Sequence, residues 1–437
     1  MFLGLPNALQ FLLATVLGRQ ATTTTPRSLK FHLRHAHAAV LSADDDSFDT
    51  AAARPRVIFS DYSPSSAFVS DDYAISTTTV VAHKPPSFDA FSQARHRSMR
   101  FQQSESLTWK DVEVDGPDVT KRENLLMLAM MTSNAYFERG NKEWYEVGGY
   151  NDSLPYGWEP EADGLRGHIF VSEDESTVVV TVKGTSASWL VGGGGPTVRR
   201  DKINDNMLFS CCCAKVGPTW SPVCDCHSGG HKCDQQCVEE ALTEETLFYP
   251  IGTVCVVTMC CVHLINSSQN LYNNVTYMYP DANIWIIGHS LGGSLSSLLG
   301  ATFGVPVVTF EAPGERRAAQ RLHLPSPPSL HHITHVYHTA DPIPMGICNG
   351  VTSACAIGGY ALESRCHLGK AIRYDTITKL GWGANVQYHG ILQIIEKLLK
   401  EDWDPENGIA VPVAAEEVDC VDCFDWEFGS FKNVSKH

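Results

Sequence analysis

The segment Gly288-His-Ser-Leu-Gly292 carries the residues whose types and spacing point most directly to chemistry. It matches the pattern G-x-S-x-G, in which a serine on a sharp turn between a strand and a helix acts as a nucleophile. The apolar run Asn283–Ile287 predicts a buried strand, and small residues from Leu291 to about Leu299 predict a helix. Ser290 is therefore the candidate nucleophile. The alternative is a glycine-rich turn whose serine only caps a helix.

A serine hydroxyl is a poor nucleophile at its ordinary pKa, so a base and an acid that orients the base are needed. In folds with this turn, the acid and then the histidine follow the serine along the chain. Asp341 is the candidate acid because it follows an apolar strand, in a loop that contains prolines; Asp375 also stands near a strand end. His389 is the candidate base because it directly precedes an amphipathic helix. We predict that His389 accepts the proton of Ser290 and that Asp341 holds the imidazole tautomer.

Both assignments have alternatives. Asp341 could make only a local turn hydrogen bond, and His389 could be a histidine that caps a helix. The other histidines downstream of the serine fit less well, because His367 stands next to a cysteine and His437 is the last residue.

A developing oxyanion needs backbone N–H groups near the serine. One is expected from Leu291, the residue after the nucleophile, and the other from a loop that follows an earlier strand. The loop Lys183–Ser186 directly follows the apolar strand Thr177–Val182. Thr185 is therefore the candidate second donor, and the alternative is an ordinary turn after a strand.

Alternating strands and helices must position these residues. The predicted strands cover His168–Val171, Thr177–Val182, Asn283–Ile287, Val305–Phe310 and His332–His338. The predicted helices cover Leu125 to about Tyr136, Leu291 to about Leu299, Glu315 to about Leu322, and Gly390–Lys400. This pattern is typical of an α/β fold with a mostly parallel sheet.

We predict one α/β domain over residues 106–400, with a cysteine-rich insertion over 208–261. Residues 19–105 contain short biased runs with faint periodicity, so we expect a weakly ordered lead there. Residues 401–437 are rich in acidic side chains and are expected to form a tail or a small appendage.

Composition narrows the class of protein. The chain has 437 residues, with 33 Lys and Arg against 49 Asp and Glu, and its formal net charge is −16. A nucleic-acid-binding protein would need a basic surface, so that class is excluded. Hydrophobic residues make up 43% of the chain, which excludes a wholly disordered protein. Serine hydrolysis needs no cofactor, and we expect neither a cofactor nor a bound metal.

The compartment is predicted from the start of the chain and from its cysteines. Residues 1–18 are apolar and uncharged, but they are shorter than the ~20 residues of a usual spanning helix and lack a basic start, so a signal-anchor and a cleaved signal both stay open. Together with 15 cysteines, this start favours an oxidising secretory lumen. Four N-x-S/T sequences would be glycan acceptors there: Asn151, Asn266, Asn274 and Asn433.

Ten of the cysteines lie between residues 211 and 261. The run Cys224–Cys237 places cysteines and histidines at spacings similar to those of a zinc site. In an oxidising lumen disulfides are favoured over zinc. We therefore expect disulfides that stabilise a loop-rich insertion between the strand that precedes Thr185 and the strand that precedes Ser290.

These motifs together resemble the fungal class 3 lipases, and more closely their autophagy-related branch, which disintegrates autophagic bodies in the vacuole. The resemblance implies an α/β-hydrolase fold, a triad of Ser290, Asp341 and His389, a lid within the cysteine-rich region, and a single-pass anchor with the catalytic domain in the lumen. The similar stretches span most of residues 109–400. They are Trp109–Val112, Lys183–Ser186, Gly192–Gly195, Leu208–Cys213, Gly288–Gly293, Phe310–Gly314, the Asp341 loop and Ser364–Gly369.

Residues 254–269 depart from the pattern of that family. This apolar stretch contains Cys255, Cys260, Cys261 and the Asn266 sequon. We interpret it as a lineage-specific insertion or a translated intron, so these residues are assigned no function.

Two functions of different class fit the sequence. The favoured one is a serine lipase that reaches the vacuole lumen through the secretory pathway and endosomes. It would hydrolyse acyl esters of membrane phospholipids, triacylglycerol or both, and lyse vesicles such as autophagic bodies. The alternative is a cysteine-rich lumenal protein that binds lipid or protein through a degenerate hydrolase domain. The complete set of Ser290, Asp341 and His389 favours the enzyme.

Overall fold

The computed structural model describes residues 28–42, 54–61, 74–101, 107–137, 140–147, 166–185, 198–214, 222–242, 271–350 and 353–431. The apolar start at 1–18, the stretch 254–269 and the sequons at Asn151, Asn266 and Asn433 lie outside these residues. Within the described ranges, no helix has the length and apolar character needed to cross a membrane.

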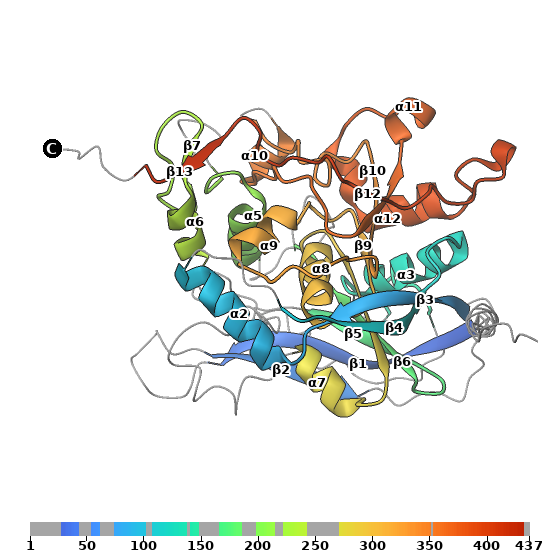
Figure 1. Cartoon of the computed structure of the whole chain (residues 1–437). Helices are drawn as coiled ribbons and strands as arrows, with labels where there is room; N and C mark the ends of the chain where they lie inside the picture. Colours follow the sequence, from blue (N-terminus) through green and yellow to red (C-terminus); the bar gives the residue numbers. More distant parts are fainter. Residues whose placement is uncertain are drawn as a thin grey trace, which may run out of the picture.

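A mixed sheet forms the centre of the molecule (Figure 1). Its strand order is β12-β11-β10-β9-β8-β6-β5-β1-β3-β4, and β2 pairs with β1. The strands β11, β10, β9, β8 and β6 are parallel, and antiparallel strands extend the sheet at both ends. The strands are β1 Ser28–Ser42, β2 Arg54–Asp61, β3 Ala74–Lys84, β4 Lys110–Pro117, β5 Arg166–Ser172, β6 Thr177–Val182, β7 Lys232–Asp234, β8 Asn283–His289, β9 Val307–Phe310, β10 Ile333–His338, β11 Lys370–Tyr374, β12 Ala415–Glu416 and β13 Glu427–Gly429.

Helices cover both faces of this sheet. One face packs against α5 to α9, and the other against α3, α12 and η3 (Figure 1). The helices are α2 Phe88–Phe101, α3 Arg122–Asn134, α5 Val198–Phe209, α6 Gln235–Ala241, α7 Leu271–Met278, α8 Leu291–Phe303, α9 Arg316–Arg321, α10 Ala354–Gly358, α11 Thr376–Leu380, η2 Val386–His389, α12 Ile391–Ile394, η3 Ile395–Leu399 and η4 Pro405–Asn407. The sequon residue Asn274 lies in α7.

Strand β8 shows why this sequence forms a central strand. Side chains alternate between the two faces of a strand, and both faces of β8 are apolar. Ile284 and Ile286 pack with α8, whereas Trp285 and Ile287 pack with α3 and α12. A strand buried on both sides is typical of a parallel sheet between two helical layers. Its carboxyl end places its last residue, His289, and the next residue, Ser290, at one edge of the sheet. The mostly parallel α/β fold predicted from the sequence is confirmed.

The described residues 28–42, 54–61 and 74–101 differ from the weakly ordered lead that we expected over 19–105. Strands β1 and β3 join the main sheet, and α2 follows them. The apolar periodicity is faint because polar groups make several of the tertiary contacts. His83 bonds the side chains of Asp111 and Ser329, and Arg95 donates to the carbonyl of Leu322 at 2.7 Å.

The acidic segment after residue 400 also differs from the expected tail, because it is bonded to the domain at several points. Its strand β12 pairs with β11, and β13 pairs with β7. Disulfides join Cys420 to Cys366 and Cys423 to Cys211. The segment lacks apolar periodicity because it is held by cystines and by buried carboxylates rather than by an apolar face.

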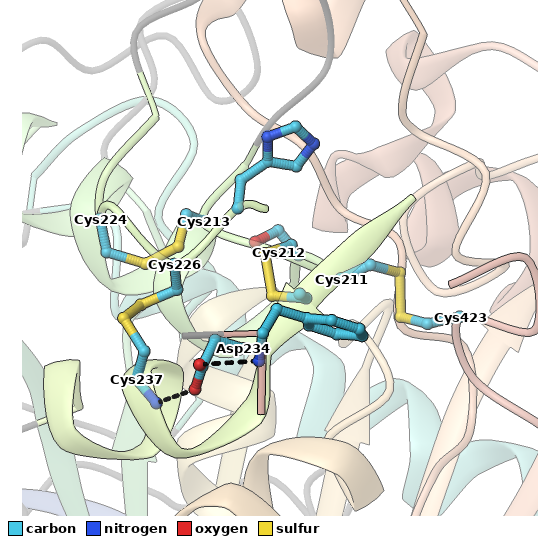
Figure 2. Close-up of a disulfide and its surroundings, with 12 residues drawn as sticks. Cys211, Cys212, Cys213, Cys224, Cys226, Asp234, Cys237 and Cys423 are labelled. Carbon is cyan, nitrogen blue, oxygen red and sulfur yellow. Dashed lines mark hydrogen bonds between the residues drawn. A yellow bond between two sulfur atoms is a disulfide. The ribbon is translucent and has the colours of Figure 1, made fainter. Parts of the chain in front are cut away.

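The cysteine-rich region is held by disulfides, as the sequence predicted. Three consecutive cysteines follow α5 and bond to three different segments: Cys211 to Cys423, Cys212 to Cys233, and Cys213 to Cys224 (Figure 2). A fourth disulfide joins Cys226 to Cys237, next to Asp234, whose carboxylate accepts from the backbone N–H of Cys237 at 3.0 Å and of Phe431 at 3.3 Å (Figure 2). With Cys348–Cys355 and Cys366–Cys420, every cysteine among the described residues is paired. The other three cysteines are those of the stretch 254–269.

Glu417 binds the C-terminal segment to the domain through an ion pair with His367. Its carboxylate accepts from the backbone N–H of His367 at 2.8 Å and from Nδ1 at 3.1 Å. Burial alone would raise the pKa of Glu417, but the hydrogen bonds and charge of His367 lower it to about 2. Burial alone would lower the pKa of His367, but Glu417 and Glu315 raise it above its usual 6.5.

These shifts give the ion pair a defined pH range. The contribution of Glu417 is present above its usual pKa of 4.5 and is lost as the pH falls towards 2. The contribution of His367 is present below pH 6.5 and is lost as the pH rises through its raised pKa. The pair therefore stabilises the fold most between these limits.

We expect Glu417→Gln to lower the Tm most at about pH 5.5 and least at alkaline pH. Thermal unfolding across pH measures this, with the exposed Glu406→Gln as the control. A Tm difference that does not vary with pH would contradict the ion pair.

Candidate active site

Ser290 lies on the turn between β8 and α8. Its backbone has φ 57° and ψ −132°, a strained conformation for a residue other than glycine. A Cβ on Gly288 would collide with the carbonyl oxygen of Gly292, and a Cβ on Gly292 would collide with that of Val182. The glycines of the motif are therefore required by close packing of the backbone. The turn places the serine side chain at the edge of the sheet, between the strand and the helix that the sequence predicted.

The structure brings together the three residues predicted to form a triad. His389 Nε2 lies 2.8 Å from Ser290 Oγ, and His389 Nδ1 lies 2.6 Å from Asp341 Oδ2. Ser290 is 7% exposed, His389 1% and Asp341 0%. This geometry lets the imidazole accept the serine proton while the carboxylate holds Nδ1–H.

The end of β10 positions both the acid and the base. His338 Nδ1 accepts from the backbone N–H of Asp341 at 3.1 Å, and its Nε2–H donates to the carbonyl of Tyr388 at 3.2 Å. The loop before η2 is tied to the same place, because Asn385 N–H donates to the carbonyl of Ala340 at 2.9 Å. A single histidine thus connects the Asp341 turn to the residue before His389.

The other candidates from the sequence lie elsewhere. Asp375 caps α11 by accepting from the N–H of Thr378, and it is exposed. His367 pairs with Glu417 on the C-terminal segment. His437 lies outside the described residues.

The charge on Asp341 is set by its partner. Burial alone would raise the pKa of this carboxyl, but the charge and the hydrogen bond of His389 hold it below its usual value. Asp341 Oδ1 also accepts from the N–H of Ile343 at 3.0 Å. The acid is therefore ionised beside the imidazole, as stabilisation of an imidazolium requires.

A second histidine, His289, links the three loops of the site, and sequence reasoning did not find it. Its Nε2–H donates to the carbonyl of His389 at 2.7 Å, and its Nδ1 accepts from the hydroxyl of Tyr136 at 2.7 Å. That hydroxyl in turn accepts from the N–H of Gly184 at 2.9 Å. Burial, and then the charge of His389, lower the pKa of His289 to about 3, so this histidine stays neutral in an acidic medium. The one sign in the sequence that could have pointed to His289 is its position directly before Ser290.

The predicted oxyanion donors lie beside Ser290. A Cβ on Gly184 would approach Ser290 Cβ to 2.9 Å, so the Thr185 loop packs directly on the nucleophile. Thr185 is fixed because its hydroxyl donates to Asp205 of α5 at 2.6 Å. Leu291 is the first residue of α8, where the helix end favours a negative charge. Their role as oxyanion donors stays a prediction. The same holds for the lid, since residues 186–197 and 215–221 lie outside the described ranges.

One buried cluster has the residue types of a metal site. Glu315, His335 and His367 offer ligand atoms that all lie within 4.8 Å of one another. Both ring nitrogens of His367 are already hydrogen-bonded, to Glu417 and to the carbonyl of Ala312. Glu315 accepts from Ser297 and from the N–H of Leu368. These contacts fit a hydrogen-bonded ionic cluster that holds α9 and the C-terminal segment on the sheet.

A known protein family matches the part of the chain that contains Ser290 and Asp341. Residues 238–348 match the family model described as lipase (class 3). A triacylglycerol lipase from Penicillium expansum is similar in structure, with a TM-score of 0.27 and 14% identity over 57% of this chain and 77% of that protein. The class that the fold and the site define is that of the carboxylic ester hydrolases with a lipase fold.

Similar proteins identify the family within this class of ester hydrolases. "Putative lipase ATG15" of Cryptococcus neoformans var. neoformans serotype D (strain B-3501A) is 45% identical over 383 residues, or 74% of this chain and 70% of that protein. The protein of the same name from Mycosarcoma maydis is 52% identical over 310 residues, or 69% of this chain and 56% of that protein. The chain belongs to the ATG15 family of lipases. It spans little more than half the length of several of these relatives.

Proposed function

We propose that this chain is a serine lipase in which Ser290 attacks an acyl ester, His389 accepts and returns the proton, and Asp341 holds the imidazolium. The observation that carries this proposal is the 2.8 Å contact between His389 Nε2 and Ser290 Oγ, with Asp341 at 2.6 Å behind the ring. The N–H groups of Leu291 and Thr185 would stabilise the tetrahedral oxyanion. Collapse of the tetrahedral intermediate breaks the ester C–O bond, and His389 gives its proton to the leaving alcohol. Water, deprotonated by His389, then attacks the acyl-serine, releases the carboxylic acid and restores the Ser290 hydroxyl.

The proposed place of action is the lumen of the secretory pathway, endosomes and the vacuole. The disulfides that pair every described cysteine support an oxidising compartment. The neutral His289 supports a site that keeps its hydrogen bonds in an acidic medium. We place a membrane anchor or signal at residues 1–18, and glycans at Asn151, Asn274 and Asn433.

The proposed substrates are acyl esters of membrane phospholipids and triacylglycerol. The resemblance to autophagy-related lipases and the name of the relatives favour vesicles inside the vacuole, such as autophagic bodies, as the physiological target. Lipids are then the binding partners of the chain.

Product analysis on defined lipids tests this function. The full chain and Ser290→Ala would each be incubated with phosphatidylcholine vesicles that contain triacylglycerol, and separately with a soluble short-chain ester, from about pH 4 to about pH 8. We expect the wild type to release fatty acids from the vesicles and acid from the soluble ester. Ser290→Ala should bind the vesicles equally and release none. Fatty-acid release that is the same in both proteins would reject Ser290 as the nucleophile. Vesicle binding without hydrolysis by the wild type would favour the degenerate binding protein instead.

A further inference from the structure

Glu311 is a fully buried carboxyl next to the triad, and the mechanism above does not use it. It belongs to the stretch Phe310–Gly314 and directly follows β9, one strand away from the β10 strand that leads to Asp341. It is 0% exposed, and its φ of 45° lies in the left-handed region that residues other than glycine rarely adopt. A buried acid in a strained backbone at a sheet edge needs a physical reason.

The contacts of Glu311 direct its side chain towards Asp341. Its N–H donates to the carbonyl of Val336 at 2.9 Å, which holds its backbone against β10. Its Oε1 accepts from the backbone N–H of His338 at 3.1 Å. Its carboxyl lies next to the carboxyl of Asp341, close enough for each to act on the charge of the other. Among the described residues, no N–H or hydroxyl donor reaches its Oε2.

The ionisable groups that face Glu311 leave it without a counter-charge. They are Asp341 and His338 at the end of β10, His389 behind Asp341, and Tyr337. His338 Nε2 lies 3.8 Å from Glu311 Oε1, but burial lowers the pKa of this histidine. His338 is neutral in this arrangement, because its Nδ1 accepts from the N–H of Asp341 while its Nε2–H donates to Tyr388. The imidazole of His389 is already bonded to Asp341 Oδ2.

Two adjacent buried carboxyls cannot both be ionised, because their repulsion adds to the cost of burying each charge. Asp341 has the favourable partner His389 and keeps the charge. Glu311 must then carry the proton, and burial together with the charge of Asp341 does raise its pKa well above the usual value. A proton on Oε2 also gives this oxygen a hydrogen-bond partner, because the O–H group can donate to Asp341.

We propose that Glu311 is a positioning residue, which as a protonated acid donates a hydrogen bond to Asp341 and fixes that carboxylate against His389. This inference rests on the proposed function, since it gives Glu311 a role through Asp341. The two acids then share a single negative charge, which lies on Asp341. Ionisation of Glu311 would place a second negative charge beside Asp341 and break this hydrogen bond.

Two substitutions separate the protonated form from the ionised one. The amide of Glu311→Gln can donate to Asp341 and accept from the N–H of His338, so we expect its kcat on a soluble ester to stay within about threefold of wild type. Glu311→Leu cannot donate, and its kcat should fall roughly 10- to 100-fold with little change in KM, because the carboxylate and imidazole lose their alignment. Ionisation of Glu311 should end the activity of the wild type at alkaline pH. Glu311→Gln cannot ionise, so it should remain active at a higher pH than the wild type.

Glu315 provides a matched control four residues further along the chain. It is also 0% exposed, but histidine partners hold its pKa below the usual value, so it is ionised. We expect Glu315→Gln to lower thermal stability while the folded protein keeps the wild-type kcat and pH profile. A loss of kcat in Glu311→Gln as large as in Glu311→Leu would overturn the proposal.

Infrared difference spectra test the proton itself without relying on activity. Wild type minus Glu311→Gln at about pH 7 should show the C=O stretch of a protonated carboxylic acid. The absence of this band would overturn the proposal even in an active enzyme. If the band is present but the wild type hydrolyses no ester, the proposed function fails while the protonation of Glu311 stands.

Discussion

Ser290→Ala and His389→Ala are each expected to lower kcat on a soluble ester by roughly 10⁴- to 10⁶-fold, and the double variant should be no slower than either single variant. The reason is the 2.8 Å contact between Ser290 Oγ and His389 Nε2. Without the base the hydroxyl stays protonated, and without the hydroxyl the base has no proton to accept, so removal of one residue makes the other useless. Steady-state kinetics on one ester, with the residual rate compared to the uncatalysed reaction, measures the three variants.

The control for this prediction is Ser296→Ala, on the same helix as the nucleophile turn. The hydroxyl of Ser296 is buried and donates only to the carbonyl of Gly292 in the described contacts, so its loss should leave kcat nearly unchanged. Losses that multiply in the double variant would mean that Ser290 and His389 act independently, which is inconsistent with a triad.

Loss of the Cys366–Cys420 disulfide is expected to lower the stability of the fold strongly. The bond closes a loop with a sequence separation of 54, and cross-linking a loop of this length stabilises a fold by about 4 kcal/mol through the lost entropy of the unfolded chain. It also holds Glu417 beside His367. The double variant Cys366→Ser and Cys420→Ser should therefore unfold at much lower denaturant concentration. Denaturant unfolding followed by fluorescence measures the difference.

The Cys348–Cys355 disulfide is the matched comparison, because it closes a loop with a separation of only 7 and the same relation gives about 2 kcal/mol. Replacing this pair with serine should cost clearly less stability. If both double variants lose the same amount, loop closure is not the source of the stabilisation.

The sequence was most informative where apolar pattern and motif agree. Strand β8 is apolar on both faces and leads directly into the serine, so the strand, the turn and the helix follow from local residues alone. The order of acid and histidine after the serine then selects Asp341 and His389, because each follows or precedes a regular element at the sheet edge.

The remaining features depend on contacts between distant segments. Glu311 and Tyr136 carry no local sign of a role; their partners lie on other strands and loops. Strand β3 has many Thr and Ser residues, so its period is weak even though Ile75 and Ala82 are buried. The pairing of Cys211, Cys212 and Cys213 also depends on the folded chain, since many pairings fit one set of cysteines.

The long-range disulfide between Cys211 and Cys423 keeps the chain covalently connected after proteolytic cleavage. It joins residues with a sequence separation of 212. Any single cut of the backbone between them leaves two fragments that are still one covalent molecule. A molecule that is cut once in a loop between these cysteines therefore keeps Ser290, Asp341 and His389 together, because all three lie between them. Such a nicked molecule would separate into pieces only after reduction.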